Sequence, residues 1–139
     1  MRNGLNYKSL LFFAYALSFV LLISLNFNCK TKDIDTNLQL LSERINNKCP
    51  IIIDSKTVLL STSVPCQKCF LYLYQLDFDS NTSNINEFVT NKKEFIINSV
   101  KTSKDMSYFK NNNITISYQY VDTKGNALTK IIISPEDYN

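Results

Sequence analysis

The chain of 139 residues contains no histidine and no tryptophan, and it has only two glycines and three prolines. Histidine is the side chain that titrates nearest to neutral pH, and it is the commonest transition-metal ligand in proteins. Its absence excludes Ser-His-Asp and Cys-His catalytic sites. Since no other group of residues forms a recognisable catalytic set, we expect a protein that is not an enzyme and that needs no cofactor.

A strong excess of one charge is also missing. Lys and Arg number 15 against 12 Asp and Glu, and two of the bases, Arg2 and Lys8, lie in residues 1–28, which contain no acid. The rest of the chain is therefore almost neutral. Nucleic-acid-binding domains normally carry a basic patch or stripe. Because none is present, nucleic acid is not an expected partner.

The sequence does contain one long apolar run, from Leu10 to Phe27. A basic start followed by such a run is typical of a secretory signal, although 18 residues are also enough to span a bilayer. A buried core helix is the alternative, but a helix without a polar face would have to be covered on all sides. We therefore expect residues 1–28 to be a signal peptide or an N-terminal membrane anchor.

Cys29 follows the apolar run directly, at the position where a bacterial lipoprotein is cleaved and acylated. The lipobox is imperfect, because Leu25 stands four residues before the cysteine instead of three and Asn28 replaces the usual small residue. A lipid on Cys29 and an uncleaved membrane anchor therefore both remain open, and we favour the lipid. Either anchor would hold residues 29–139 on the periplasmic or extracellular side of a bacterial membrane.

Residues 29–139 are expected to form a single small α+β domain. Apolar residues at helical spacing predict helices near residues 35–46 and 84–101, with a further turn near 104–110, and Asn84 is placed to cap the longer helix. Alternating or β-branched runs predict strands at 57–62, 70–78, 114–120 and 128–134. Gly125 suits the positive-φ position of the last hairpin. The predicted fold is helix-strand-strand-helix-strand-strand, with a four-stranded antiparallel sheet and helices on one face.

A resemblance to a known family rests on two groups of residues. The groups are Ile45-Asn46-Asn47-Lys48-Cys49-Pro50 with Asp54, Thr57 and Leu59, and Asn113-Ile114-Thr115-Ile116 with Tyr118, Tyr120, Asp122, Gly125 and Pro135-Glu136-Asp137-Tyr138. Through the pattern N-x-x-C-P-x-x-x-D-x-x-T, residues 40–139 resemble a family of small, uncharacterised exported bacterial proteins that includes candidate lipoproteins. The resemblance implies an exported α+β domain and carries over no catalytic residue.

Cys66 and Cys69 form the sharpest local motif, Cys-Gln-Lys-Cys. A C-x-x-C pair can exchange thiols and disulfides, or supply half of a zinc site. Redox-active pairs usually begin a helix, whereas an apolar run typical of a strand follows this one, so we favour a structural disulfide between Cys66 and Cys69. A redox or metal-binding protein that uses these two cysteines is the alternative function.

Three further features each have a structural and a functional interpretation. Cys49 either pairs with another cysteine or is buried as a small apolar residue. Asp54 is an acid–base candidate, but the following Ser-Lys-Thr favours a capped turn. The two tyrosine pairs are Tyr72 with Tyr74 and Tyr118 with Tyr120. They either belong to the core below the helices or expose an aromatic surface to a peptide, glycan or protein.

The sequence as a whole thus predicts a non-enzymatic binding or accessory protein that is tethered to a membrane of the cell envelope and works with another envelope protein.

Overall fold

The computed structural model describes residues 28–78 and 84–139, with side chains described from Asp33 onwards. The chain divides into two compact units, Met1–Asp33 and Ile34–Asn139. The apolar run and the side chain of Cys29 lie outside the described residues, so the predicted anchor and lipid attachment stay predictions. Among the described helices, none is both long and apolar enough to cross a bilayer.

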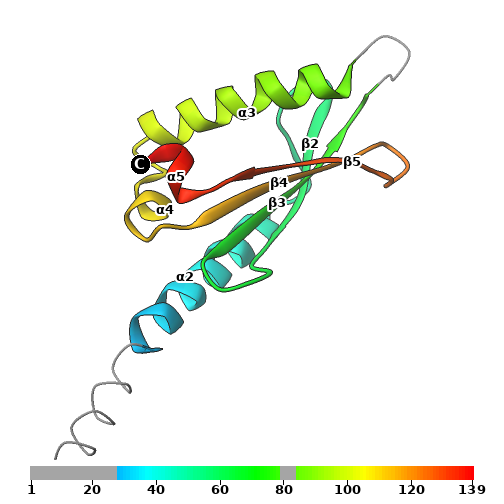
Figure 1. Ribbon diagram of the computed structural model, residues 1–139. Helices are drawn as coiled ribbons and strands as arrows, with labels where there is room; N and C mark the ends of the chain where they lie inside the picture. The colour runs from blue at the N-terminus through cyan, green and yellow to red at the C-terminus, as the bar shows by residue number, and fades with distance from the viewer. Residues whose placement is uncertain (1–27, 79–83) are drawn as a thin grey trace, which may run out of the picture. The chain divides into compact units, whose positions relative to one another are not determined.

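The fold is α+β, with five strands in one mixed sheet (Figure 1). The elements in chain order are α2 (Asn28–Asn46), β1 (Ile51–Ile52), β2 (Thr57–Ser63), β3 (Cys69–Leu76), α3 (Ile85–Thr102), α4 (Ser107–Asn111), β4 (Thr115–Val121), β5 (Ala127–Ile133) and α5 (Pro135–Tyr138). The strand order across the sheet is β1-β2-β3-β4-β5.

The prediction of four antiparallel strands is wrong in two respects. Ile51 and Ile52 form an additional edge strand that pairs with β2. The two predicted hairpins, β2–β3 and β4–β5, are antiparallel as expected, but β3 and β4 pair in parallel. A parallel pair needs a long crossover, and here α3 and α4 supply it.

The predicted helix over residues 84–101 is confirmed as α3. Asn84 is its N-cap, and the side chain of Asn84 accepts a hydrogen bond from the backbone N–H of Asn86 at 2.9 Å. Ile96 and Val100 are the buried residues of this helix. The predicted positive φ of Gly125 is also confirmed, at 87° in the β4–β5 turn.

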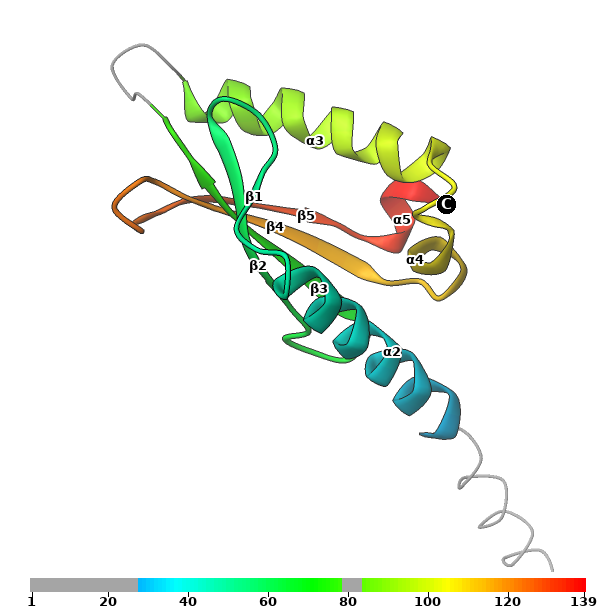
Figure 2. The same cartoon turned by 180° about the vertical axis from the view of Figure 1, so that it is seen from behind.

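The helices cover one face of the sheet. Phe88 of α3 packs edge-on against Tyr120, and Phe109 of α4 packs in the same way against Phe70. Phe70 alternates with Tyr72 along β3, and Tyr72 is paired with Tyr118, two residues before Tyr120, so these side chains share a face. Figures 1 and 2 show α3 running along β4 and β5, over one face of the sheet.

The part of α2 that belongs to the second unit is attached to the same face through Thr62 of β2. Thr62 is paired with Tyr72, and its hydroxyl lies 2.9 Å from the Ser42 hydroxyl. Both polar atoms of the Asn46 side-chain amide bond to the backbone of Thr62 at the edge of β2. Oδ1 accepts from the Thr62 N–H at 2.7 Å, and Nδ2 donates to the Thr62 carbonyl at 2.9 Å. The C-terminal end of α2 therefore closes an edge of β2 beyond the short strand β1, while Leu38 is fully buried in the core.

Candidate functional site

Four tyrosines form a stacked ladder on the helix-covered face of β3 and β4. The rings of Tyr72 and Tyr118 stack with centroids 5.3 Å apart, and those of Tyr74 and Tyr120 stack at 5.5 Å. The parallel register pairs these same residues, so the ladder follows directly from the sheet. Because the rings cover one another's faces, the ladder presents ring edges and hydroxyls. A sugar ring, which would need an open aromatic face, is therefore poorly matched.

An apolar groove lies where this ladder meets α3, and we call it the tyrosine groove. Its volume is about 200 Å³. The residues that line it are Ile53, Thr57, Tyr74, Lys92, Phe95, Ile96, Ser99, Tyr118 and Tyr120. Small-molecule pockets usually measure about 300–1,000 Å³. The tyrosine groove thus has room for one or two apolar side chains of a partner, and less than a typical metabolite or cofactor requires.

Two large apolar side chains stand exposed at the rim of the tyrosine groove. Phe95 of α3 is 64% exposed, and Ile53, just after β1, is 52% exposed. The ammonium group of Lys92 lies 5.5 Å from the centroid of the Phe95 ring, within the range of a cation–π contact. Exposed aromatic and aliphatic side chains beside an apolar pocket are typical of protein-binding sites.

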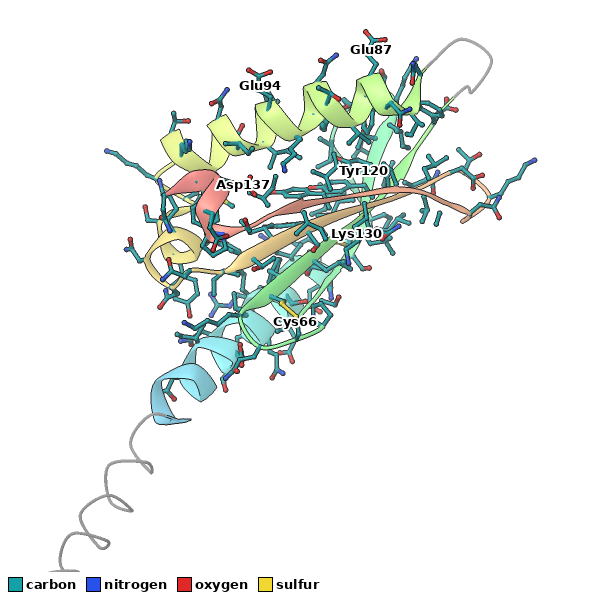
Figure 3. The ribbon with its side chains drawn as sticks, in the orientation of Figure 1. Cys66, Glu87, Glu94, Tyr120, Lys130 and Asp137 are labelled. Atoms are coloured by element: carbon teal, nitrogen blue, oxygen red, sulfur yellow. A yellow bond between two sulfur atoms is a disulfide. The ribbon has the colours of Figure 1, made fainter. Side chains whose placement is uncertain are left out.

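The tyrosine hydroxyls in the groove are available to a partner. Tyr120 is only 2% exposed and lies between α3 and the sheet (Figure 3), yet neither its hydroxyl nor that of Tyr74 or Tyr118 bonds to another described residue. Burial, and secondarily the neighbouring Cys49 thiol, raises the pKa of Tyr74 to about 12. Burial also raises the pKa values of Tyr118 and Tyr120. The three phenols are therefore neutral at pH 7 and can donate hydrogen bonds to a partner's carbonyl or carboxylate groups.

A larger and more polar cavity of about 490 Å³ lies next to the groove, at the first turns of α3. Thr57 and Lys92 line both hollows, while Asp54, Asp77 and Glu87 are among the residues that line only the polar one. Glu87 projects from α3 away from the sheet in Figure 3. The apolar groove is the better candidate site for a protein partner, because its lining is mostly apolar, whereas the lining of the larger cavity is mostly polar and would have to be desolvated.

Cys66 and Cys69 are joined by a disulfide in the turn between β2 and β3. Cys69 begins β3, so no helix starts at the motif to stabilise a thiolate, and thioredoxin-like redox catalysis gains no support from this geometry. No group of three or more cysteine or acidic side chains able to hold a metal ion occurs within the described residues.

The remaining candidates from the sequence are Cys49, Asp54 and the tyrosine pairs. Cys49 is partly buried with a free thiol, so the hypothesis of a Cys49 pairing with Cys66 or Cys69 is wrong. Asp54 caps a turn: its Oδ1 accepts from the Lys56 N–H at 2.8 Å, and this bond holds the pKa of the carboxyl below its usual value. The tyrosines belong to the helix-covered face, as the core interpretation predicts, with a groove at their edge.

Phe95 and Ile53 are the site residues that sequence reasoning missed. Phe95 lies in α3 but outside the apolar stripe that predicted this helix. An aromatic residue away from the buried face of a helix was therefore the sequence signal for an exposed apolar site. Ile53 follows two other isoleucines, and nothing in the sequence distinguishes the exposed Ile52 and Ile53 from the partly buried Ile51.

Comparison with known proteins identifies a family and a fold. Residues 33–129 match a family described as a domain of unknown function, DUF8479. No curated protein matches the sequence significantly.

Three solved structures share the fold, all at low sequence identity. A candidate secreted protein of Pseudomonas aeruginosa has a TM-score of 0.66 at 9% identity, over 81% of this chain and 98% of that one. The type II secretion system pilotin AspS of Vibrio cholerae has a TM-score of 0.60 at 14% identity, over 78% and 94%. The type II secretion system pilotin EpsS of Vibrio vulnificus has a TM-score of 0.64 at 6% identity, over 79% and 96%.

Proposed function

This chain belongs to the DUF8479 family, and we propose that it is a non-enzymatic accessory protein of the bacterial cell envelope that binds a polypeptide segment of a partner protein in the tyrosine groove. The observation that carries the proposal is the groove itself: an apolar hollow of about 200 Å³, with exposed Phe95 and Ile53 at its rim and unpaired tyrosine hydroxyls inside. The fold shared with two secretion pilotins supports an accessory role in a secretion assembly.

The chemistry of the groove favours a polypeptide over other ligands. An apolar side chain can enter between Phe95 and the tyrosine ladder, and the main-chain carbonyls beside it can accept hydrogen bonds from the phenols. Burying a leucine- or phenylalanine-sized side chain contributes about 1.5–3 kcal/mol. Two such anchors and one or two hydrogen bonds give an interface that depends on a few residues.

The proposal includes tethering of the domain to a membrane outside the cytoplasm. The apolar run before Cys29 supports export, and a lipid on Cys29 is the favoured anchor. Metabolic labelling with an alkyne fatty acid tests this in cells. Label should enter the wild-type chain and be lost from Cys29→Ser, whereas equal labelling of the two chains would exclude the lipid and leave the uncleaved anchor.

Partner binding is tested with a matched pair of variants in the full chain. Phe95→Asp puts a charge at the groove, and Ile132→Asp puts the same charge on the other face of the sheet, where Ile132 is 50% exposed. Both variants should keep the thermal stability of the wild type, because both side chains are already exposed. After affinity purification from membranes and quantitative mass spectrometry, Phe95→Asp should lose an envelope protein that Ile132→Asp retains. Equal recovery of every envelope protein with both variants would contradict the proposal.

A further inference from the structure

The turn between β2 and β3 holds one residue in an unusual backbone conformation. Lys68 has φ = 53°, in the left-handed region that residues other than glycine rarely adopt. It stands inside the four-residue loop that the Cys66–Cys69 disulfide closes. The Cys69 N–H also donates to the Cys66 carbonyl at 3.1 Å. The disulfide therefore restrains the turn in which Lys68 has this conformation.

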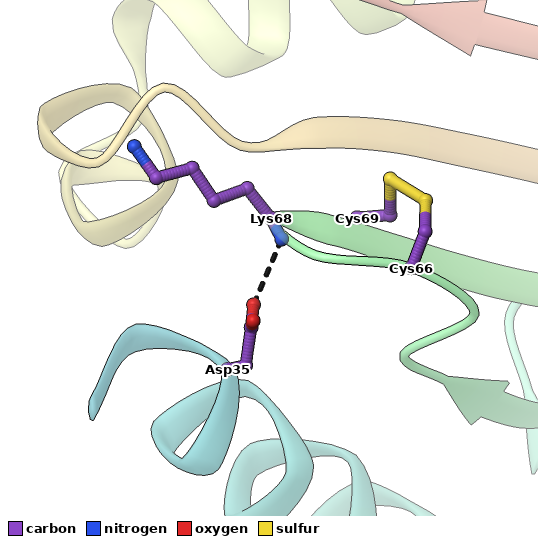
Figure 4. The surroundings of a disulfide bond; sticks show 4 residues. All are labelled: Asp35, Cys66, Lys68 and Cys69. Atoms are coloured by element: carbon purple, nitrogen blue, oxygen red, sulfur yellow. Dashed lines mark hydrogen bonds between the residues drawn. A yellow bond between two sulfur atoms is a disulfide. The ribbon is translucent and has the colours of Figure 1, made fainter. Parts of the chain in front are cut away.

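The backbone of Lys68 connects three elements of the fold. Its N–H donates to Oδ1 of Asp35 in α2 at 2.8 Å (Figure 4). Its carbonyl accepts from the N–H of Thr115 at the start of β4, at 2.9 Å. The conformation of one turn residue thus holds the hairpin against β4 on one side and against α2 on the other.

Asp35 is the second residue of the compact unit that begins at Ile34. Asp35 is the eighth residue of α2, and the bond from Lys68 therefore attaches the start of the part of α2 that belongs to this unit. A longer hydrogen bond runs from the Tyr108 hydroxyl to the Ile34 carbonyl, at 3.5 Å, and the side chain of Ile34 packs against the core. The next firm anchor along the helix is the fully buried Leu38. The bond from the Lys68 turn to Asp35 is thus one of the contacts that hold residues 34–37 to the domain.

We propose that the Cys66–Cys69 disulfide is a redox-controlled clamp that holds residues 34–37 of α2 to the β2–β3 turn. Cys66 is exposed, so a dithiol reductant of the envelope can reach the bond. One thiolate of the reductant attacks a cysteine sulfur to form a mixed disulfide, and its second thiolate then resolves it. The chain gains two electrons and two protons as two thiols, and the reductant leaves as a disulfide.

Reduction has a local consequence. Without the closed loop, Lys68 is released to more common backbone conformations, its N–H leaves Asp35, and residues 34–37 fray from the domain. This inference concerns the attachment of α2 and is independent of whether the tyrosine groove binds a partner.

Hydrogen exchange measured by mass spectrometry on the full chain tests the clamp, with and without dithiothreitol. Peptides that cover residues 33–41 should exchange about fivefold faster after reduction. Peptides that cover β4, residues 115–121, should keep their rate, because the core remains folded. Equal rates in residues 33–41 for the two redox states would overturn the clamp. Acceleration of both regions together would overturn it as well, since it would mean global unfolding.

Two variants of Asp35 give the matched control. Asp35→Ala removes the acceptor of the Lys68 N–H, so its 33–41 peptides should already exchange fast when oxidised and should not respond to dithiothreitol. Asp35→Asn keeps an Oδ1 acceptor and should keep a redox response. If Asp35→Ala retains the full response of the wild type, the disulfide does not act through this hydrogen bond and the clamp is wrong.

Discussion

At the scale of single residues, the tyrosines divide into two chemical classes. The Tyr138 hydroxyl is buried and donates to the Ile114 carbonyl at 2.8 Å. The Tyr120 hydroxyl has no hydrogen-bond partner among the described residues, although its ring is almost fully buried. The first hydroxyl is part of the structure, and the second is available for binding.

This difference predicts that a Tyr→Phe substitution lowers the free energy of unfolding at position 138 and leaves it almost unchanged at position 120. Tyr138→Phe leaves the Ile114 carbonyl without its side-chain donor and should lower the free energy of unfolding by about 1–2 kcal/mol. Tyr120→Phe should leave it within about 0.5 kcal/mol of the wild type. Urea denaturation of the two variants measures both values. A larger loss for Tyr120→Phe than for Tyr138→Phe would mean that the groove hydroxyl is structural.

Asp137 predicts the pH dependence of the C-terminal helix. Its Oδ2 accepts from the Ser134 N–H at 2.8 Å, and this bond, with a smaller contribution from Lys93, holds the pKa of the carboxyl below its usual value of 3.8. A lowered folded-state pKa gives stability that is present above about pH 4 and is lost as the pH falls through the folded-state pKa.

Asp137→Asn should therefore be less stable than the wild type at neutral pH, and the difference should shrink below pH 4. Thermal unfolding of both chains between pH 7 and pH 2.5 measures this difference. Asp54, Asp122 and Glu136 also have lowered pKa values, so both chains should lose stability in acid. A difference that stays constant over the whole range would show that Asp137 does not act through its charge.

At the scale of elements, the sequence predicted what depends on local pattern. The apolar stripe and the cap at Asn84 predicted α3, and alternation with Gly125 predicted the β4–β5 hairpin, because both elements are defined by residues close along the chain. The edge strand β1 has only two residues, and Pro50 before it gives no periodic signal. The parallel pairing of β3 with β4 could not be predicted from the sequence, because it depends on the path that the chain takes through α3 and α4 before β4 begins.

The attachment of α2 was also beyond sequence reasoning. Ser42 and Asn46 are ordinary polar residues of an amphipathic helix, and their role depends on the edge of β2 that the short β1 leaves unpaired. The two bonds between the Asn46 amide and the backbone of Thr62 depend on how α2 packs against the sheet, and no local sequence pattern predicts them.

Asn46→Ala should therefore detach this end of α2. It removes the acceptor of the Thr62 N–H and the donor to the Thr62 carbonyl, and we expect a loss of about 1–3 kcal/mol in the free energy of unfolding. Asn47→Ala is the control, because Asn47 is exposed next to it and its side chain bonds no described residue. Equal urea midpoints for the two variants would contradict the proposed role of Asn46 in closing the strand edge.

At the scale of the whole molecule, the helices and the groove share one face of the sheet. The other face carries Lys130 and Ile132, with Lys130 on the far side of the sheet from α3 in Figure 3. The two faces therefore differ in what they offer: one has the tyrosine groove, and the other has the exposed side chains of Lys130 and Ile132. A partner that inserts side chains should distinguish between them.

Site-specific photo-crosslinking in cells tests whether a partner protein enters the tyrosine groove. A photoreactive amino acid at Phe95 lies at the rim of the tyrosine groove, and the same group at Ile132 lies on the other face, with both positions at least half exposed. We expect a specific adduct with one envelope protein from position 95, weakened by Tyr120→Phe, and no such adduct from position 132. The same adduct from both positions, or an adduct from position 132 alone, would contradict binding in the groove.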